Sequence, residues 1–456
     1  MASHPMRDML EAAASRQSAH MPGHGGRPPF PLRDLYGLDT TELSVTDDLY
    51  SPRSGILLAQ KAYAVCAGSA ETLFLHNGST QGVHVMLEMG MHEGDTVILP
   101  RNAHLSASQA CILAGLRIVW VPVHRMGSYV YVRAQDVLET MHAHPEARRV
   151  LLTRPDYFGG CMDSASVRKI AKAAGRLGMQ LVVDEAHGAH LPFGGEVESA
   201  GALGADAWVQ SVHKTIPGLT GSAVLHLKNE SDRKKALRIL RREQTSSPSF
   251  LLMLSTDEAR AWMEENGKES LAELRRKADC LLKCAVECGY SDPREMWKAS
   301  GQVFDPLRVV IRAPQGGSAL MEELEKSGVD AEMAMGRNVV LLLSPLMSWE
   351  SVQRIADAIR ANPARGSLPE EETETREDLP ESVMDVRAAA FADTEDVPLG
   401  AAAGRVSAVS AGCYPPGIPL VVPGEVISEE HVRRLAQAGA EGRFGMEGET
   451  IACVAV

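Results

Sequence analysis

The chain is 456 residues long and carries 59 Asp and Glu against 46 Lys and Arg, for a formal net charge of −13. No stretch is rich in Lys or Arg, which argues against nucleic acid or anionic membrane as a main partner. No apolar run approaches the roughly 20 residues that span a bilayer. At roughly 150 residues per domain, the length predicts about three domains.

The first 20 residues lack the basic start, apolar centre and cleavage site of a secretory signal, so we expect a cytoplasmic protein. The eight cysteines are scattered along the chain, which fits reduced thiols and not a disulfide framework. Cys280, Cys284 and Cys288 recur every four residues and would share one helix face. Because no histidines follow at zinc spacing, we interpret them as packing residues, with a metal or redox site as the alternative.

Changes of pattern along the chain divide it into five parts. These are an N-terminal arm (1–50), a large domain (51–265), a small α/β domain (266–365), an acidic linker (366–382) and a C-terminal α+β domain (383–456).

Within the large domain, apolar runs alternate with helical patterns such as residues 164–177. This alternation predicts a mainly parallel sheet of seven strands covered by helices on both faces, with ligands at the carboxyl ends of the strands. The expected strands are residues 72–75, 96–99, 117–122, 150–153, 180–184, 207–212 and 222–227.

A phosphate-binding motif is expected after the first of these strands, in residues 76–82 (HNGSTQG), which open a helical pattern. Backbone N–H groups at a helix start, with Gly78 and the hydroxyls of Ser79 and Thr80, form a cradle for a phosphate. The same residues also fit an ordinary helix cap. The phosphate role is favoured because two later motifs point to a phosphorylated cofactor.

A histidine, His104, follows the next expected strand in residues 101–106 (RNAHLS). At this place an imidazole can stack on the ring of a cofactor and supply a proton near the reacting carbon. The alternative is that His104 caps a helix over residues 106–114.

Two further motifs place Asp184 and Lys214, thirty residues apart, at the ends of two apolar strands. A lysine in this arrangement forms a Schiff base with the aldehyde of pyridoxal 5'-phosphate (PLP). The carboxylate keeps the pyridine nitrogen protonated, so that the ring accepts electrons. Asp184 with Glu185 would otherwise suit Mg²⁺ in a nucleotide hydrolase, but a Walker-type loop is missing. The pair predicts carbanion chemistry on an aspartate-aminotransferase-like (fold-type I) domain.

The neighbours of these two residues have expected roles at the same site. His187 follows Asp184 closely enough to approach the phenolate oxygen of the cofactor, and Ser211 and His213 flank Lys214 closely enough to bind its phosphate. A buried lysine outside such a site is unusual, because desolvation disfavours its charge.

The region after residue 230 is dominated by long helical patterns and then becomes a smaller α/β unit. Its expected elements are a strand at 307–312, a helix at 318–326, a strand at 339–344 and a helix at 350–361. Residues 366–381 (GSLPEEETETREDLPE) are acidic and poor in apolar side chains. Charge repulsion therefore predicts a solvated tether, with a nucleic-acid mimic as the alternative.

These motifs resemble the ornithine/lysine/arginine decarboxylase family of bacterial fold-type I PLP enzymes. The matching segments run from the arm to the last domain, so nearly the whole chain is covered. They are residues 20–26 (HMPGHGG), 77–80 (NGST), 101–104 (RNAH), 184–190 (DEAHGAH), 211–215 (SVHKT), 244–253 (QTSSPSFLLM) and 414–425 (YPPGIPLVVPGE).

The resemblance implies Lys214 as the Schiff-base lysine, Asp184 as the partner of the pyridine nitrogen and His104 as the stacking residue. Around the rest of the cofactor it implies Gly78, Ser79, Thr80, His187, Ser211 and His213. It also implies a homodimer or tetramer whose active sites are shared between subunits. Larger members carry an N-terminal wing domain that builds decamers, and a motif that starts at residue 20 implies the short form without it.

The reaction that the resemblance implies is decarboxylation of arginine, lysine or ornithine to the amine and CO2, as in polyamine biosynthesis. The substrate amine displaces Lys214, the Cα–carboxylate bond is held perpendicular to the ring, and Lys214 or His104 returns a proton to Cα. Transamination, aldol cleavage or oxygen-dependent oxidation remain alternatives on the same scaffold. A non-catalytic binding protein is disfavoured, because Lys214 and Asp184 are both present.

Substrate recognition is predicted from acidic side chains, because a basic substrate needs partners of opposite charge. The candidates are Glu42, Asp47, Asp48 and Glu425, each with a solvated surface carboxylate as the alternative.

Three positions depart from the pattern of the family. Gly25 stands where it usually has Lys, and Tyr50 stands where it often has His. Arg154 lies in residues 154–157 (RPDY), where the family commonly has a smaller, neutral stretch, so we expect it to repel a cationic substrate or to bind a carboxylate.

Overall fold

A computed structural model describes residues 16–27, 35–43, 45–368, 373–414, 416–439 and 442–455. The first 15 residues of the predicted arm, residues 369–372 of the predicted linker and one proline of the 414–425 motif lie outside this description. Within these ranges, no helix has both the length and the apolar character needed to cross a membrane.

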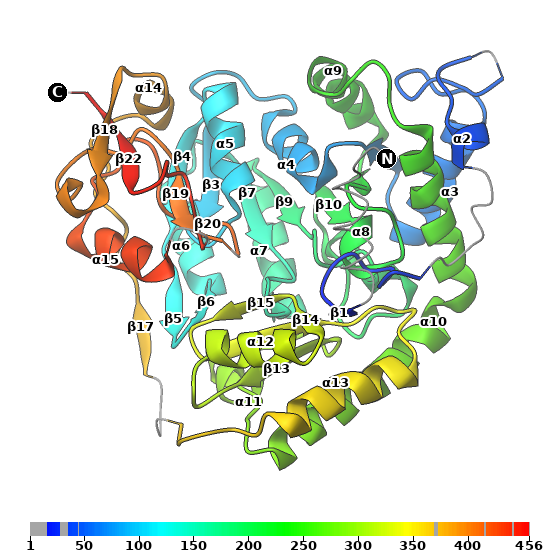
Figure 1. Ribbon diagram of the computed structural model, residues 1–456. Helices are drawn as coiled ribbons and strands as arrows, with labels where there is room; N and C mark the ends of the chain where they lie inside the picture. Colours follow the sequence, from blue (N-terminus) through cyan, green and yellow to red (C-terminus); the bar gives the residue numbers. More distant parts are fainter. Residues whose placement is uncertain are drawn as a thin grey trace, which may run out of the picture.

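A seven-stranded sheet in the order β2-β11-β10-β9-β7-β3-β4 forms the centre of the molecule (Figure 1). The strands from β10 to β4 are parallel, and β11 is antiparallel to both of its neighbours. All seven expected strands are confirmed, as is the mainly parallel arrangement. Their bounds are β2 (Glu71–Leu75), β3 (Thr96–Pro100), β4 (Arg117–Val121), β7 (Ala147–Thr153), β9 (Gln180–Asp184), β10 (Ala207–Ser211) and β11 (Ala223–Leu227).

Helices cover both faces of this sheet, because successive side chains along each strand are apolar and point to opposite sides. In β2, Phe74 packs in the core that contains α3, α6, α7 and α10, whereas Leu73 and Leu75 pack with α4, α5 and α9. The expected two-sided covering is therefore confirmed (Figure 1). The helices are α3 (Gly55–Ala67), α4 (Gly78–Glu88), α5 (Leu105–Ala114), α6 (Ala134–Ala143), α7 (Ser164–Leu177), α9 (Arg233–Glu243) and α10 (Phe250–Glu287).

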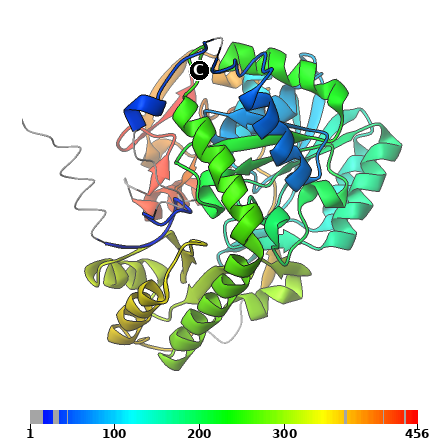
Figure 2. The same cartoon turned by 90° about the vertical axis from the view of Figure 1, so that its right-hand side faces the viewer.

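The small domain is reached through α10, a helix of 38 residues that runs from one domain into the other (Figure 2). The domain boundary predicted at residue 265 lies inside this helix, because an unbroken helical pattern carries no boundary signal. The described part of the arm joins the small domain through β1, which pairs with β14. The elements are β1 (Gln17–Ala19), α12 (Gly317–Lys326), β13 (Arg308–Arg312), β14 (Val329–Ala331), β15 (Met333–Met335), β16 (Asn338–Leu342) and α13 (Trp349–Ala361).

Part of the predicted acidic linker is a strand and not a solvated tether. Glu374 accepts a hydrogen bond from the Tyr131 hydroxyl (2.6 Å), and Glu377 accepts one from Arg125 (2.5 Å). The tether prediction is wrong here because polar and basic side chains of a neighbouring hairpin compensate the acidic charges that were expected to repel one another. The three strands are β17 (Glu374–Arg376), β5 (His124–Met126) and β6 (Tyr129–Tyr131).

The C-terminal domain is α+β, as expected, and packs beside α5 and the β4 edge of the large sheet (Figure 1). Arg101, which directly follows β3, joins it to the large domain. Its guanidinium donates to the carbonyls of Pro419 (3.0 Å) and Leu420 (2.9 Å) and to the Glu425 carboxylate (2.9 Å). The elements are α14 (Val386–Ala390), β18 (Thr394–Pro398), β19 (Ala411–Cys413), β20 (Ile418–Val421), α15 (Glu429–Ala438), β21 (Arg443–Phe444) and β22 (Thr450–Val454).

The Arg101–Glu425 pair is buried, with relative exposures of 7% and 1%. We expect Arg101→Met to destabilise the protein by about 3–5 kcal/mol, because it leaves the Glu425 charge buried without a partner. The double variant Arg101→Met/Glu425→Leu is expected to recover a large part of this loss. Urea unfolding of the wild type, both single variants and the double variant measures the coupling. Additive effects of the two changes would contradict it.

Candidate active site

Asp184 and Lys214 meet at one edge of the sheet because β9 and β10 are parallel neighbours. Asp184 is the last residue of β9, and its register partner in β10 is Val209. Lys214 lies in the short helix α8 (Val212–Thr215), which begins directly after β10 ends. The carboxyl ends of two adjacent strands thus bring the predicted carboxylate and lysine together, at the place where α/β sheets bind ligands.

The Lys214 side chain is half-buried, and its Nζ lies 3.2 Å from Nε2 of His187. Burial lowers the pKa of Lys214 below its usual value. The charges of Asp184 and Glu332 act in the opposite direction, and that of Arg308 adds to the lowering. A lysine with a lowered pKa has more of the neutral amine that attacks an aldehyde.

The Asp184 side chain is buried, with 8% exposure, and its Oδ1 accepts a hydrogen bond from the Ala186 N–H (3.1 Å). Burial raises the pKa of Asp184, while the charge of Lys214 lowers it. A buried carboxylate of this kind is suited to a cationic N–H partner, because such a partner offsets the desolvation of its charge.

His104 caps α5: its Nδ1 accepts a hydrogen bond from the Ser106 N–H (3.2 Å). Burial lowers the pKa of His104 to about 4, and the charge of Lys214 contributes to this lowering. The C-terminal domain packs on the ring, since a Cβ added at Gly417 would lie 3.1 Å from its Cδ2. The capping role of His104 is confirmed, and stacking on a cofactor stays a prediction.

The predicted phosphate cradle lies at the start of α4, where Gly78 has a φ of 65° and Asn77 provides no side-chain cap. Close packing of α4 on β10 sets this position, since a Cβ added at Gly82 would lie 2.3 Å from a Val209 methyl group. Ser79 and Thr80 occupy the first turn of the helix. The Gly78 N–H already donates to the Gly221 carbonyl (3.1 Å), whereas the next N–H groups of the first turn receive no side-chain cap. Such N–H groups at a helix start favour an anion.

The strand end beside Lys214 offers further polar atoms. The hydroxyls of Ser211 and Thr215 are buried and have no hydrogen-bond partner among the described residues. Nδ1 of His213 lies 2.8 Å from the Ser222 carbonyl oxygen. Buried hydroxyls without partners are costly unless a ligand satisfies them, so these atoms fit a bound phosphate.

His187 is held from two sides. Its Nδ1 lies 2.6 Å from Nη2 of Arg308. The Tyr157 ring packs edge-on against the imidazole, with 5.1 Å between the two ring centroids. Burial moves the pKa of His187 well below its usual value, and the charges of Lys214 and Arg308 add to this lowering. The imidazole is therefore neutral.

Sequence reasoning did not identify Arg308, Glu332 or Tyr157 as residues of this site. Arg308 begins an apolar strand of the small domain, and Glu332 lies between two short strands. Neither position carries a motif, because both reach the site only through the packing of the small domain on the large one. Tyr157 lies in the stretch that was noted only for its departure at Arg154.

Two family models match this chain. "Orn/Lys/Arg decarboxylase, major domain" matches residues 16–288, and "Orn/Lys/Arg decarboxylase, C-terminal domain" matches residues 370–439. The chain belongs to the Orn/Lys/Arg decarboxylase family. The uncharacterized protein YaaO of Bacillus subtilis is 32% identical over 451 residues, covering 93% of this chain and 92% of YaaO. Arginine decarboxylase of the same organism is 29% identical, covering 94% and 92%.

Solved structures place this family member among the fold-type I enzymes. Lysine decarboxylase A from Pseudomonas aeruginosa matches with a TM-score of 0.76 at 17% identity, over 98% of this chain and 80% of that one. Serine palmitoyltransferase from Sphingomonas wittichii matches with a TM-score of 0.57 at 17% identity, over 78% and 96%. The expected fold class is therefore confirmed.

Two of the substrate candidates, Glu425 and Arg154, are engaged in structural contacts. Glu425 is paired with Arg101 at the joint between domains. The Arg154 side chain, 1% exposed, donates to the carbonyls of Met162 (3.0 Å) and Glu198. Sequence alone suggested free charges because it does not reveal these partners. The structure gives no support to a substrate role for either side chain.

The acidic candidates of the arm lie near the start of α3. Asp47 accepts hydrogen bonds from the N–H groups of Arg53 (2.8 Å), Ser54 (2.9 Å) and Ile56 (3.1 Å), which makes it a structural cap. Asp48 accepts one from the Tyr50 N–H (2.8 Å). Glu42 is half-buried in the same region. The principal charges that act on Lys214 come from other residues, namely Asp184, Glu332 and Arg308.

The arm crosses directly over the lysine helix at Gly23. The Gly23 N–H donates to the His213 carbonyl (2.6 Å), and a Cβ at this position would lie 2.7 Å from the Ile216 carbonyl oxygen. We expect Gly23→Ala to cost about 1–3 kcal/mol, because the arm or α8 must move. The measurements are urea unfolding and affinity for the expected cofactor. Gly55→Ala, where an added Cβ meets open space, is the matched control, and an equal effect of both changes would contradict the prediction.

Proposed function

We propose that this chain catalyses PLP-dependent decarboxylation of a basic amino acid, either arginine, lysine or ornithine, to the amine and CO2. The observation that carries the proposal is the half-buried Lys214 beside Asp184 at adjacent strand ends, in a member of the Orn/Lys/Arg decarboxylase family. Relatives of similar length are named arginine decarboxylase, and a more distant one is named constitutive lysine decarboxylase.

The residues present fit PLP. Lys214 supplies the amine for the aldehyde, and the buried Asp184 carboxylate suits a protonated ring nitrogen. The uncapped start of α4 and the unpartnered hydroxyls of Ser211 and Thr215 suit the phosphate. When bound, PLP supplies an electron sink for the carbanion that remains after the carboxylate leaves.

The protein's own residues then hold, orient and protonate the substrate. The lowered pKa of Lys214 lets its Nζ accept and return a proton, so Lys214 is the group that we assign to protonation at Cα. His104, with a pKa of about 4, is neutral at pH 7 and offers a flat ring face. Gly417 of the C-terminal domain packs against this ring.

Arginine is the first substrate to test. The similarity is higher to arginine decarboxylase of Bacillus subtilis, with 29% identity over 455 residues, than to constitutive lysine decarboxylase of Escherichia coli, with 21% over 497.

The proposal is tested by incubating the PLP-loaded protein separately with arginine, lysine, ornithine and a panel of other amino acids. Mass spectrometry of the products is expected to show the matching amine from at least one basic amino acid. A keto acid would instead indicate transamination, and an aldehyde or peroxide would indicate aldol cleavage or oxidation. Amine formation only from non-basic amino acids would contradict the substrate class.

We also infer a cytoplasmic homodimer or tetramer with shared active sites, acting in amine or polyamine formation. Support for self-association comes from large apolar side chains exposed near the arm and on α3, namely Tyr36 (94%), Leu58 (67%) and Val65 (80%). Light scattering after size-exclusion chromatography measures the mass, and a stable monomer with full activity would contradict this inference.

A further inference from the structure

Arg308 lies behind His187, on the side away from Lys214. It begins β13 of the small domain, is 1% exposed, and its Nη2 lies 2.6 Å from Nδ1 of His187. On the other side of the ring, Nε2 lies 3.2 Å from Nζ of Lys214. The three side chains therefore form a line from the small domain to the lysine.

The chemistry of the guanidinium decides where the proton of His187 resides. A guanidinium has N–H donors and no acceptor, so Nδ1 of His187 must accept the hydrogen bond from Arg308. Burial and the charges of Lys214 and Arg308 keep the imidazole neutral. A neutral imidazole with Nδ1 as the acceptor carries its proton on Nε2. The N–H of His187 thus points to Lys214.

We propose that Arg308 is a positioning residue that fixes His187 in the Nε2–H tautomer, so that the imidazole donates toward the Lys214 amine and toward an anionic acceptor bound there. The inference rests on the proposed function and deepens it. The phenolate oxygen of PLP, which is the predicted partner of His187, is such an acceptor. An N–H directed at Lys214 also requires a lone pair on Nζ, so the same tautomer favours the neutral, nucleophilic amine.

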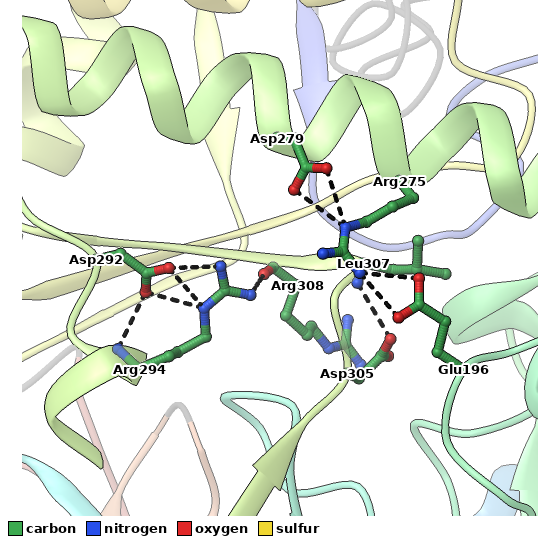
Figure 3. A network of polar contacts seen from close by, with 8 residues as sticks. All are labelled: Glu196, Arg275, Asp279, Asp292, Arg294, Asp305, Leu307 and Arg308. Carbon is green, nitrogen blue, oxygen red and sulfur yellow. Dashed lines mark hydrogen bonds and ion pairs between the residues drawn. The ribbon is translucent and has the colours of Figure 1, made fainter. Parts of the chain in front are cut away.

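Arg308 is itself held in place by the small domain (Figure 3). Its backbone carbonyl accepts a hydrogen bond from Nη1 of Arg294 (2.7 Å), and the nearby Asp305 carboxylate balances its charge. Asp305 is fixed in turn, because it accepts a hydrogen bond from the Leu307 N–H (3.1 Å). A Cβ at Gly159 would lie 2.6 Å from Cγ of Arg308, so the large domain also confines the side chain. The packing of the two domains therefore holds Arg308 in the position from which it directs the N–H of His187 toward Lys214.

The test uses the full-length protein labelled with ¹⁵N at histidine, with and without PLP, and His187→Gln to assign the signal of this residue. In the wild type we expect the Nε2–H tautomer of His187 at all values between about pH 6 and 9, because its pKa lies well below this range. A wild-type signal of the Nδ1–H tautomer or of the imidazolium would overturn the inference without any variant. The cofactor-free spectrum also separates a failure of this inference from a failure of PLP to bind.

Arg308→Met is expected to give a mixture of tautomers. In the PLP-loaded protein it is also expected to raise, by about one unit or more, the pH midpoint at which the Lys214 nitrogen loses its proton, read from the cofactor absorbance. The substitution removes a positive charge and weakens the hydrogen bond that His187 donates to the cofactor oxygen. The carboxylates of Asp184 and Glu332, which favour the protonated nitrogen, remain.

Arg149→Met is the matched control. It removes another buried guanidinium, which donates to the carbonyls of Met86 and Met89. Arg149 pairs with Gln180 at the start of β9, at the opposite end of that strand from Asp184. We expect this substitution to preserve the tautomer of His187. An Arg308→Met protein that keeps the Nε2–H tautomer, or an Arg149→Met protein that loses it to the same extent, would overturn the proposal.

Discussion

We expect Lys214→Ala to abolish amine formation and Lys214→Arg not to restore it. The expected loss of kcat is at least about a thousandfold, because the variants lack both the amine that attaches the cofactor and the group that returns a proton to Cα. A guanidinium keeps the positive charge but remains protonated, so it has no lone pair for attack on an aldehyde. Steady-state assay of amine production with added PLP measures the effect.

Lys277→Ala is the matched control for this change. Lys277 is a buried lysine of α10 whose Nζ donates to the Met347 carbonyl (2.7 Å), and it is not among the residues assigned to the cofactor. We expect it to lower stability and to leave the cofactor absorbance of the folded protein in place. If Lys214→Ala kept full activity, or if Lys277→Ala abolished the cofactor signal while Lys214→Ala kept it, the assignment of Lys214 would be wrong.

Asp184→Asn is expected to lower kcat by roughly 10²–10³-fold and to weaken PLP binding, because an amide does not hold a ring nitrogen in its protonated form. The volume of the side chain is nearly unchanged, so the effect reports charge and not packing. PLP titration and the steady-state kinetics of amine formation measure the two effects separately.

The adjacent residue supplies a close control for this substitution. The Glu185 carboxylate is also buried, but it accepts hydrogen bonds from Ser199 (2.8 Å), Gln210 (2.7 Å) and the Ala200 N–H (2.7 Å) within the protein core. Glu185→Gln is therefore expected to affect stability and not PLP affinity. Equal losses of PLP affinity from both changes would show that Asp184 has no specific role toward the cofactor.

The strands and the cofactor motifs could be predicted because they depend on local sequence. In β9, for example, a short continuous apolar run ends at Asp184, and such a run, without polar alternation, already indicates a strand inside a helix-covered sheet. The parallel topology then brings Asp184 and Lys214 to the same edge without further information.

The contacts between domains could not be predicted in the same way. Glu425 and Arg154 looked like free charges in the sequence, whereas Arg101 and backbone carbonyls engage them in the fold. Arg308 presents the opposite case, since it looks like an ordinary strand residue in the sequence but contacts His187, 121 residues earlier in the chain, in the fold. Such pairings depend on how separate domains pack, and a single sequence carries no local signal for them.

The most direct test of decarboxylation follows the carboxyl carbon itself. PLP-loaded wild-type protein is incubated with arginine, lysine or ornithine labelled with ¹³C at the carboxyl group, and the labelled CO2 and the amine are quantified together. We expect equal amounts of both from the preferred substrate and neither from Lys214→Ala. Label that stays in an organic product with all three amino acids, with no labelled CO2 released, would contradict the proposed function.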